Sequence, residues 1–85
     1  MYEISITRSA AKELRSIPKH AIKRIVDNID LLAQNPRPEG SKKIKGTKLN
    51  LWRIRIGNYQ VVYDIQDKIK IIEIIKIGHR KEIYE

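Results

Sequence analysis

The chain has no cysteine and no phenylalanine, and its 85 residues include a single tryptophan. Without cysteine it has no disulfide, no thiolate metal ligand and no cysteine nucleophile. Its two histidines are too few for a usual zinc site. No apolar run is long enough to cross a bilayer, and the first residues show no signal-peptide pattern. We therefore expect a single domain over residues 1–85, located in the cytoplasm, with no cofactor and no membrane contact.

Positive charge is in excess and is clustered. Lysine and arginine number 18 against 10 acids, which gives a net charge of +8 with histidine neutral. Such an excess attracts a polyanion or an acidic partner, although ordinary solubilising charge is the alternative. One segment, with a single acid, holds seven of the basic residues: Arg37, Lys42, Lys43, Lys45, Lys48, Arg53 and Arg55. Clustering of this kind favours a phosphate-binding surface.

The hydrophobic pattern predicts the element order β-α-α-β-β-β. Residues 2–7 alternate as in a half-buried strand, with Tyr2, Ile4 and Ile6 on one face. A short helix follows Thr7 or Ser9, and a longer helix shows the spacing of one buried face. The predicted elements are a strand over 2–7, helices ending near 16 and spanning about 18–34, and strands over 51–56, 59–65 and 69–77.

The connections predict how these elements assemble. Two prolines and a glycine after residue 35 break the second helix, so a loop is expected to run to about Leu49. Short turns at Gly57-Asn58 and at residues 66–68 make the last three strands an antiparallel meander. The fold class is therefore α+β, with a helical hairpin packed on one face of a four-stranded, mainly antiparallel sheet. The other face is expected to be open.

The strand over 51–56 separates apolar from basic side chains. Trp52, Ile54 and Ile56 fall on one face, while Arg53 and Arg55 fall on the other. Two adjacent guanidinium groups make a fork-shaped anion site. The alternative is an exposed strand face with cross-strand partners such as Asp64.

The C-terminal tail supplies groups that can move protons. Cleavage of RNA without a metal needs a base for the 2′-hydroxyl, an acid for the leaving 5′-oxygen, and cations for the charged phosphate. His79 and Tyr84 can transfer protons, and Arg53, Arg55 and Arg80 can hold the phosphate. The alternatives are a structural histidine and a tyrosine that only packs.

Several stretches resemble the RelE/ParE superfamily of bacterial type II toxins. They are the helix start SAAKEL, the dipeptide Asn35-Pro36, the strand pair LWRIRIGNYQVVY and the tail IGHRKEIY. The resemblance covers essentially the whole chain and implies a microbial-ribonuclease-like fold. RelE-type members cleave mRNA in the ribosomal A site by 2′-hydroxyl attack without a metal, and a cognate antitoxin neutralises them. ParE-type members inhibit DNA gyrase and lack that nuclease set.

The resemblance implies a role for particular residues. The catalytic candidates are Arg53, Arg55, Arg80, His79 and Tyr84. Contacts to nucleic acid are expected from Lys42, Lys43, Lys45, Lys48, Gln60 and Lys81. Many relatives carry arginine at the position of Gln60, and Arg80 and Tyr84 are closer in sequence than in the best-known RelE.

The expected function is that of a ribosome-dependent mRNA endonuclease toxin, with a cognate antitoxin, the ribosome and mRNA as partners. One alternative is a ParE-like inhibitor of DNA gyrase. Another is an inactive relative that only binds the antitoxin.

Overall fold

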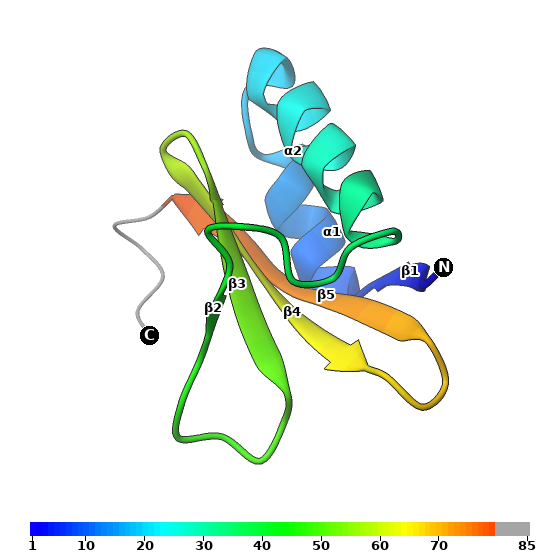
Figure 1. The fold of residues 1–85 in the computed structure, drawn as a ribbon. Helices are drawn as coiled ribbons and strands as arrows, with labels where there is room; N and C mark the ends of the chain where they lie inside the picture. Colours follow the sequence, from blue (N-terminus) through cyan, green and yellow to red (C-terminus); the bar gives the residue numbers. More distant parts are fainter. Residues whose placement is uncertain (80–85) are drawn as a thin grey trace.

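Two helices lie together on one face of a five-stranded sheet in the computed structural model, which describes residues 1–79 (Figure 1). In chain order the elements are β1 (Glu3–Ile6), α1 (Arg8–Arg15), α2 (Lys19–Leu32), β2 (Lys42–Lys43), β3 (Leu51–Ile56), β4 (Tyr59–Gln66) and β5 (Ile71–His79). The strand order across the sheet is β1-β5-β4-β3-β2. Among the described strands, β1 alone runs parallel to its neighbour, and the other pairs are antiparallel. The predicted α+β class is confirmed.

Strand β2 was missing from the predicted sheet. Lys42 and Lys43, predicted to lie in a loop, pair with Arg53 and Trp52 of β3. The N–H of Ile44 extends this pairing by donating to the carbonyl of Leu51 at 2.9 Å. Two lysines carry no apolar alternation, so only the pairing itself defines the strand. Over residues 1–79 the sheet consequently has five strands and not four.

Capping and proline chemistry set the helix boundaries. The hydroxyl of Thr7 accepts a hydrogen bond from the N–H of Ala10 at 3.1 Å, which caps the start of α1 as predicted. Pro18 has extended backbone angles and precedes the first turn of α2, where its missing N–H costs little. The helix ends at Leu32, two residues before the predicted end at Gln34.

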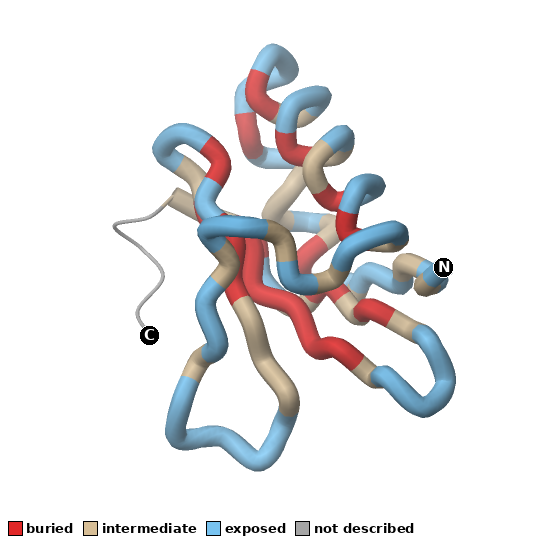
Figure 2. Tube along the Cα trace, viewed as in Figure 1, coloured by how far each residue is buried: buried red, intermediate tan, exposed pale blue. Residues whose placement is uncertain are grey.

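The core lies between the helices and the sheet face that they cover. Figure 2 shows the buried residues along the inner side of α2 and through the central strands. Ile25, Ile29 and Leu32 of α2 pack against a sheet layer that includes Tyr63 and Ile74, both fully buried. Each such aliphatic side chain contributes about 1.5–3 kcal/mol to stability. Ile6 was predicted to be buried but is 42% exposed, because β1 is an edge strand.

Two turns close the antiparallel meander. Gly57 has a φ of +60°, which permits the predicted two-residue turn between β3 and β4. The second turn is longer than predicted, and β5 begins at Ile71 where the pattern placed it at Ile69. Lys70 has a left-handed φ of +57°, which a strand cannot accommodate, and Ile69 is 63% exposed. Among residues 1–79, no helix has the length and apolar character needed to span a membrane.

Candidate nucleic-acid interface

Strand register gathers basic side chains on the sheet face that points away from the helices. Residues directly opposite each other in antiparallel strands place their side chains on the same face. Lys42, Arg53, Val62 and Lys76 are successive neighbours across β2, β3, β4 and β5. We call these four residues the basic row. Because three of them carry a positive charge, the row suits a phosphate group.

A second row lies beside the basic row and contains a buried amide. Arg55, Gln60 and Gly78 are neighbours across β3, β4 and β5, and Gly78 contributes no side chain. Gln60 is only 1% exposed, and its Nε2 has no hydrogen-bond partner within residues 1–79. An unsatisfied buried donor costs about 1–3 kcal/mol. The Gln60 amide is therefore an unsatisfied buried donor, within the described residues, in the row next to the basic row.

The middle of this face is more enclosed than the sequence predicted. Arg53 is 4% exposed and Asp64 is 6% exposed, while Arg55 is exposed to solvent. Arg53 is flanked across the sheet by Lys42 and Val62, which share its face. The expectation of a fully open face is therefore wrong. Arg53 and Arg55 each interact with another group, so neither residue is without a partner.

The predicted loop lysines lie in and next to strand β2, and one of them, Lys42, belongs to the basic row. Lys42 and Lys43 belong to β2, and Lys45 and Lys48 lie in the connection between β2 and β3. All four are exposed. Exposed lysines of this kind attract phosphate over a distance of about 10 Å at moderate salt, without fixing its position.

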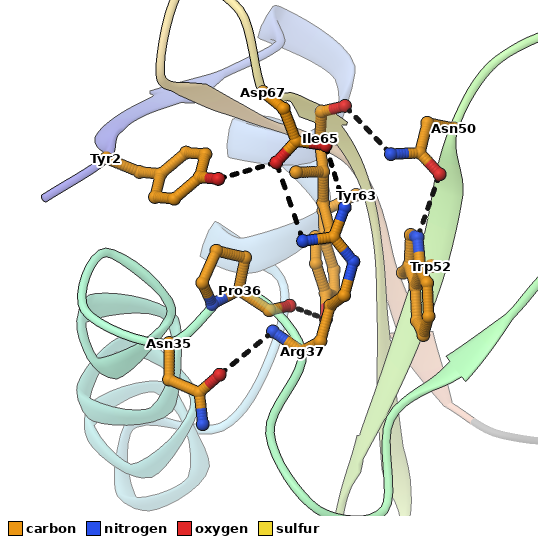
Figure 3. Close-up of polar contacts among 9 residues, drawn as sticks. All are labelled: Tyr2, Asn35, Pro36, Arg37, Asn50, Trp52, Tyr63, Ile65 and Asp67. Atoms are coloured by element: carbon orange, nitrogen blue, oxygen red, sulfur yellow. Dashed lines mark hydrogen bonds and ion pairs between the residues drawn. The ribbon is translucent and has the colours of Figure 1, made fainter.

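Arg37 does not belong to the basic face, although the sequence grouped it there. Its Nη2 lies 2.8 Å from Oδ2 of Asp67, and its guanidinium lies 5.3 Å from the centre of the Trp52 ring (Figure 3). The Tyr2 hydroxyl also donates to Asp67, at 2.5 Å. Hydrogen bonds from Arg37 and then Tyr2 lower the pKa of Asp67, and the Asp67 carboxylate raises the pKa of Arg37. The charge of Arg37 is thus neutralised locally.

His79 lies on the other side of the sheet from the basic row. It pairs with Tyr59, and the two rings meet edge to face at 5.8 Å between centres. Both residues line a hollow of about 250 Å³ where α1 meets α2, together with Glu13 and Ser16. Since Gly78 faces the basic row, strand alternation directs His79 towards the helices. The structure does not bring His79 together with Arg53 and Arg55.

Lys76 is a candidate that the sequence pattern missed. In the sequence it only interrupts a run of isoleucines in β5. A register shift between Val62 and Tyr63 pairs Tyr63 with Ile74 but Val62 with Lys76, so Ile75 is the extra residue. Such a bulge re-aims the side chains that follow it, which no two-residue periodicity reveals.

Three of the predicted site residues are not described. Arg80, Lys81 and Tyr84 lie outside the described residues. Within the described part of the chain, no three histidine, aspartate or glutamate side chains are placed to hold a metal ion.

Known proteins are similar to this chain in sequence and in fold. Residues 4–84 match the family described as ParE toxin of type II toxin-antitoxin system, parDE. Toxin RelE of Mycobacterium tuberculosis is 33% identical over 84 residues, which cover 98% of this chain and 86% of that protein. Toxin RelE3 of Methanocaldococcus jannaschii is 31% identical over 87 residues, with 98% and 96% covered.

A solved complex shows the same architecture. The archaeal RelE–RelB complex from Pyrococcus horikoshii contains a chain that matches with a TM-score of 0.84 and 34% identity, covering 96% of this chain and 98% of that one. The fold and the family match define a type II toxin. The chain belongs to the ParE toxin family, within the RelE/ParE superfamily, and its predicted RelE-like fold is confirmed.

Proposed function

We propose that this toxin is a ribosome-dependent mRNA endonuclease that is held inactive by a cognate antitoxin. The observation that carries the proposal is the basic row, with the buried Gln60 amide beside it. The row offers positive charge for one phosphate group, and Gln60 offers a hydrogen bond. Relatives named RelE and a RelE–RelB complex support the same assignment.

The proposed reaction is attack of a 2′-oxygen on the adjacent phosphorus. The bond from phosphorus to the 5′-oxygen breaks, which leaves a 2′,3′-cyclic phosphate and a 5′-hydroxyl. Arg53 and Arg55 stabilise the charge that develops on the phosphate, as preorganised donors do. Neither serves as a base, because guanidinium groups stay protonated. We assign proton transfer to Tyr84, because His79 lies on the helix side of the sheet, away from Arg53 and Arg55.

The test is cleavage of a defined mRNA on stalled ribosomes by the purified chain. Arg55→Ala is expected to slow cleavage by about 100-fold, the usual effect of removing one transition-state donor. The double change of Arg53 and Arg55 to alanine is expected to abolish it. Arg15→Ala is the matched control, because it removes the same charge from the exposed surface of α1.

Two results decide against this mechanism. Cleavage at the full rate by the double variant would remove Arg53 and Arg55 from the site. Product ends other than a cyclic phosphate and a 5′-hydroxyl would exclude 2′-hydroxyl attack. His79→Ala is expected to slow cleavage less than Arg55→Ala, because strand register places it on the helix side.

A second candidate function is inhibition of DNA gyrase. The matching family is described as ParE, which favours it. The neutral Gln60 favours it too, because the resemblance to RelE-type toxins implies an arginine at that position in many relatives. A supercoiling assay with purified gyrase separates the two functions. Inhibition of supercoiling with no cleavage of mRNA on ribosomes would reverse the order of the proposals.

A further inference from the structure

A hollow lies where the first turns of α2 meet the turn between β3 and β4, separate from the hollow beside His79. That turn and the start of α2 point towards the same end of the molecule (Figure 1). The hollow has a volume of about 220 Å³, and its polar lining comes from His20, Arg24, Asn58 and Tyr59. Among the described residues, no aspartate or glutamate lines it. Its side chains therefore suit an anion.

A glycine makes room for the guanidinium of Arg24 beside the turn. A Cβ atom on residue 57 would lie only 3.1 Å from Nη1 of Arg24. Gly57 has a φ of +60°, so the turn needs a residue that tolerates a left-handed backbone. The same glycine thus closes the hairpin and lets the arginine lie against it. Arg24 reaches from α2 to the turn, at the edge of the hollow.

Arg24 differs from other arginines and lysines of this chain in having no acid beside it. Its neighbour Lys23 places Nζ 3.1 Å from Oδ2 of Asp27, and Arg37 is paired with Asp67. Within residues 1–79, no carboxylate forms an ion pair with Arg24, whose side chain is exposed. A guanidinium carries five N–H donors in a planar fork that matches the oxygens of a phosphate group. The charge of Arg24 is therefore available to a ligand.

Tyr59 separates this hollow from the one beside His79, and the two differ in charge. Tyr59 lines both hollows. The lining of the hollow beside His79 includes Glu13, whose Oε1 accepts a hydrogen bond from the N–H of Ile77 at 3.0 Å. A carboxylate repels a phosphate group, whereas an arginine attracts it. Of the two hollows, only the one with Arg24 suits an anion.

The turn joins this hollow to the sheet face that carries the basic row. Ile56 and Tyr59 pair at the end of the hairpin, and Arg55 and Gln60 form the next pair. Because side chains alternate along a strand, Arg55 lies on the open face while Ile56 lies on the helix side. The hollow and the row of Arg55 thus flank the same turn. RNA carries a phosphate at every nucleotide, so RNA bound at Arg55 has further phosphates for a second site.

We propose that Arg24 binds a second backbone phosphate of RNA, an inference that rests on the proposed action on the ribosome. His20 and Asn58 lie in the same hollow and add hydrogen bonds to that phosphate. The site lies on the helix side, away from Arg53, so it contributes affinity and takes no part in bond breaking. Contacts to phosphate position a protein on nucleic acid without reading its sequence. The phosphate belongs either to ribosomal RNA or to the mRNA.

The experiment measures binding to ribosomes programmed with an mRNA that carries 2′-O-methyl groups in the A-site codon and cannot be cut there. Arg24→Ala is expected to raise the Kd by about fivefold, the upper range for one exposed ion pair. The slope of the logarithm of the binding constant against the logarithm of the salt concentration is expected to fall by roughly 0.7 to 0.9. Arg24→Lys keeps the charge and is expected to keep the native slope.

Lys23→Ala is the matched control. Lys23 is the adjacent residue of α2, is exposed and carries the same charge, but it is paired with Asp27. Its replacement is expected to change the Kd by less than about twofold. Thermal melts of both alanine variants are expected to match that of the native chain. The same measurement on ribosomes without mRNA identifies the source: an equal loss for Arg24→Ala assigns the phosphate to ribosomal RNA, and a loss only with mRNA assigns it to the mRNA.

Cleavage of an unmodified mRNA separates binding from chemistry. Arg24→Ala is expected to raise KM by about fivefold and to leave kcat within about twofold, as loss of uniform binding does. A lower kcat with an unchanged KM would assign Arg24 to the chemistry and overturn the proposal. A native chain that binds ribosomes through Arg24 but leaves the mRNA uncut would contradict the nuclease function and leave this site standing.

The proposal is overturned if Arg24→Ala and Lys23→Ala change the Kd equally, or if Arg24→Ala lowers the affinity without changing the salt slope. It is also wrong if Arg24→Ala weakens binding to the co-expressed product of the neighbouring reading frame while ribosome binding stays at the native level. The hollow would then take an acidic protein segment. Cleavage that depends on Arg55 but not on Arg24 would remove this site alone and keep the nuclease function.

Discussion

Replacing Tyr63 by phenylalanine tests how firmly the loop after α2 is tied to the sheet. Tyr63 is fully buried in β4, and its hydroxyl donates to the carbonyl of Pro36 at 2.7 Å. Phenylalanine fills the same space but leaves that carbonyl without its donor. A buried hydrogen bond of this type contributes about 1 kcal/mol to the free energy of unfolding. For a domain of this size the melting temperature is expected to fall by about 4–8 °C.

Urea denaturation followed by the fluorescence of the single tryptophan measures this change. The midpoint is expected to fall while the slope with urea stays constant, because the same surface becomes exposed on unfolding. A variant that is as stable as the native chain at pH 7 would show that the contact between Tyr63 and Pro36 contributes nothing. The loop would then need another anchor.

The stabilities of the native chain and the Tyr63→Phe variant are also expected to respond differently to high pH. Burial raises the pKa of Tyr63 from its usual value of 10.0 to about 12, while a hydrogen bond with Ser41 and the charge of Arg37 act in the opposite direction. Since the folded pKa is the higher one, the folded state loses stability as pH rises from 10 towards 12. Phenylalanine cannot ionise. The stability gap between native chain and variant is therefore expected to narrow over this window, and a constant gap would contradict the burial of the hydroxyl.

Two further changes have defined outcomes. Asp67→Asn removes the carboxylate that binds Arg37, so the free energy of unfolding at pH 7 is expected to fall. The pKa of Asp67 is lowered in the fold, so the native chain is expected to lose its advantage over the variant as the pH drops below the ordinary value of 3.8. Thermal melts of both proteins from pH 7 to pH 2 measure this difference. If the native chain stayed more stable than the variant by the same amount in acid, the ion pair between Asp67 and Arg37 would not be the cause of its stability. Lys76→Ala is expected to weaken ribosome binding. The slope of the logarithm of the binding constant against the logarithm of the salt concentration is expected to fall by about one. Lys12→Ala on α1 is the control and is expected to change neither quantity.

The helices and the long antiparallel strands were predictable because their signals are local. The capping hydroxyl of Thr7 predicts the start of α1, and the spacing of Ile25 and Ile29 predicts the buried face of α2. The turn at Gly57 needs only a residue that tolerates a positive φ. In each case the physical cause acts within a few residues of the feature.

The parts that the sequence did not reveal depend on distant pairing. Lys42 becomes part of a strand only because Arg53 lies beside it. The β-bulge opposite Val62 places Lys76 in the basic row. The alternation of side chains along β5 then places His79 on the helix side of the sheet. Arg37 looked like part of the phosphate-binding cluster until its contact with Asp67, thirty positions away in the chain, was seen. Register and long-range ion pairs are set by the whole fold, so a local pattern cannot supply them.

The parallel pairing of β1 with β5 has a consequence for the time at which this toxin becomes active during its synthesis. Glu3 and Ile4 meet Ile71 and Ile72, so the first strand has no partner until almost the entire described chain has been made. Contacts so distant in sequence form late and slowly. The proposed interface for RNA also needs β5, which supplies Lys76 and Gly78. A nascent chain still attached to its ribosome is thus expected to be harmless until β5 has emerged, which gives an antitoxin made alongside it time to bind.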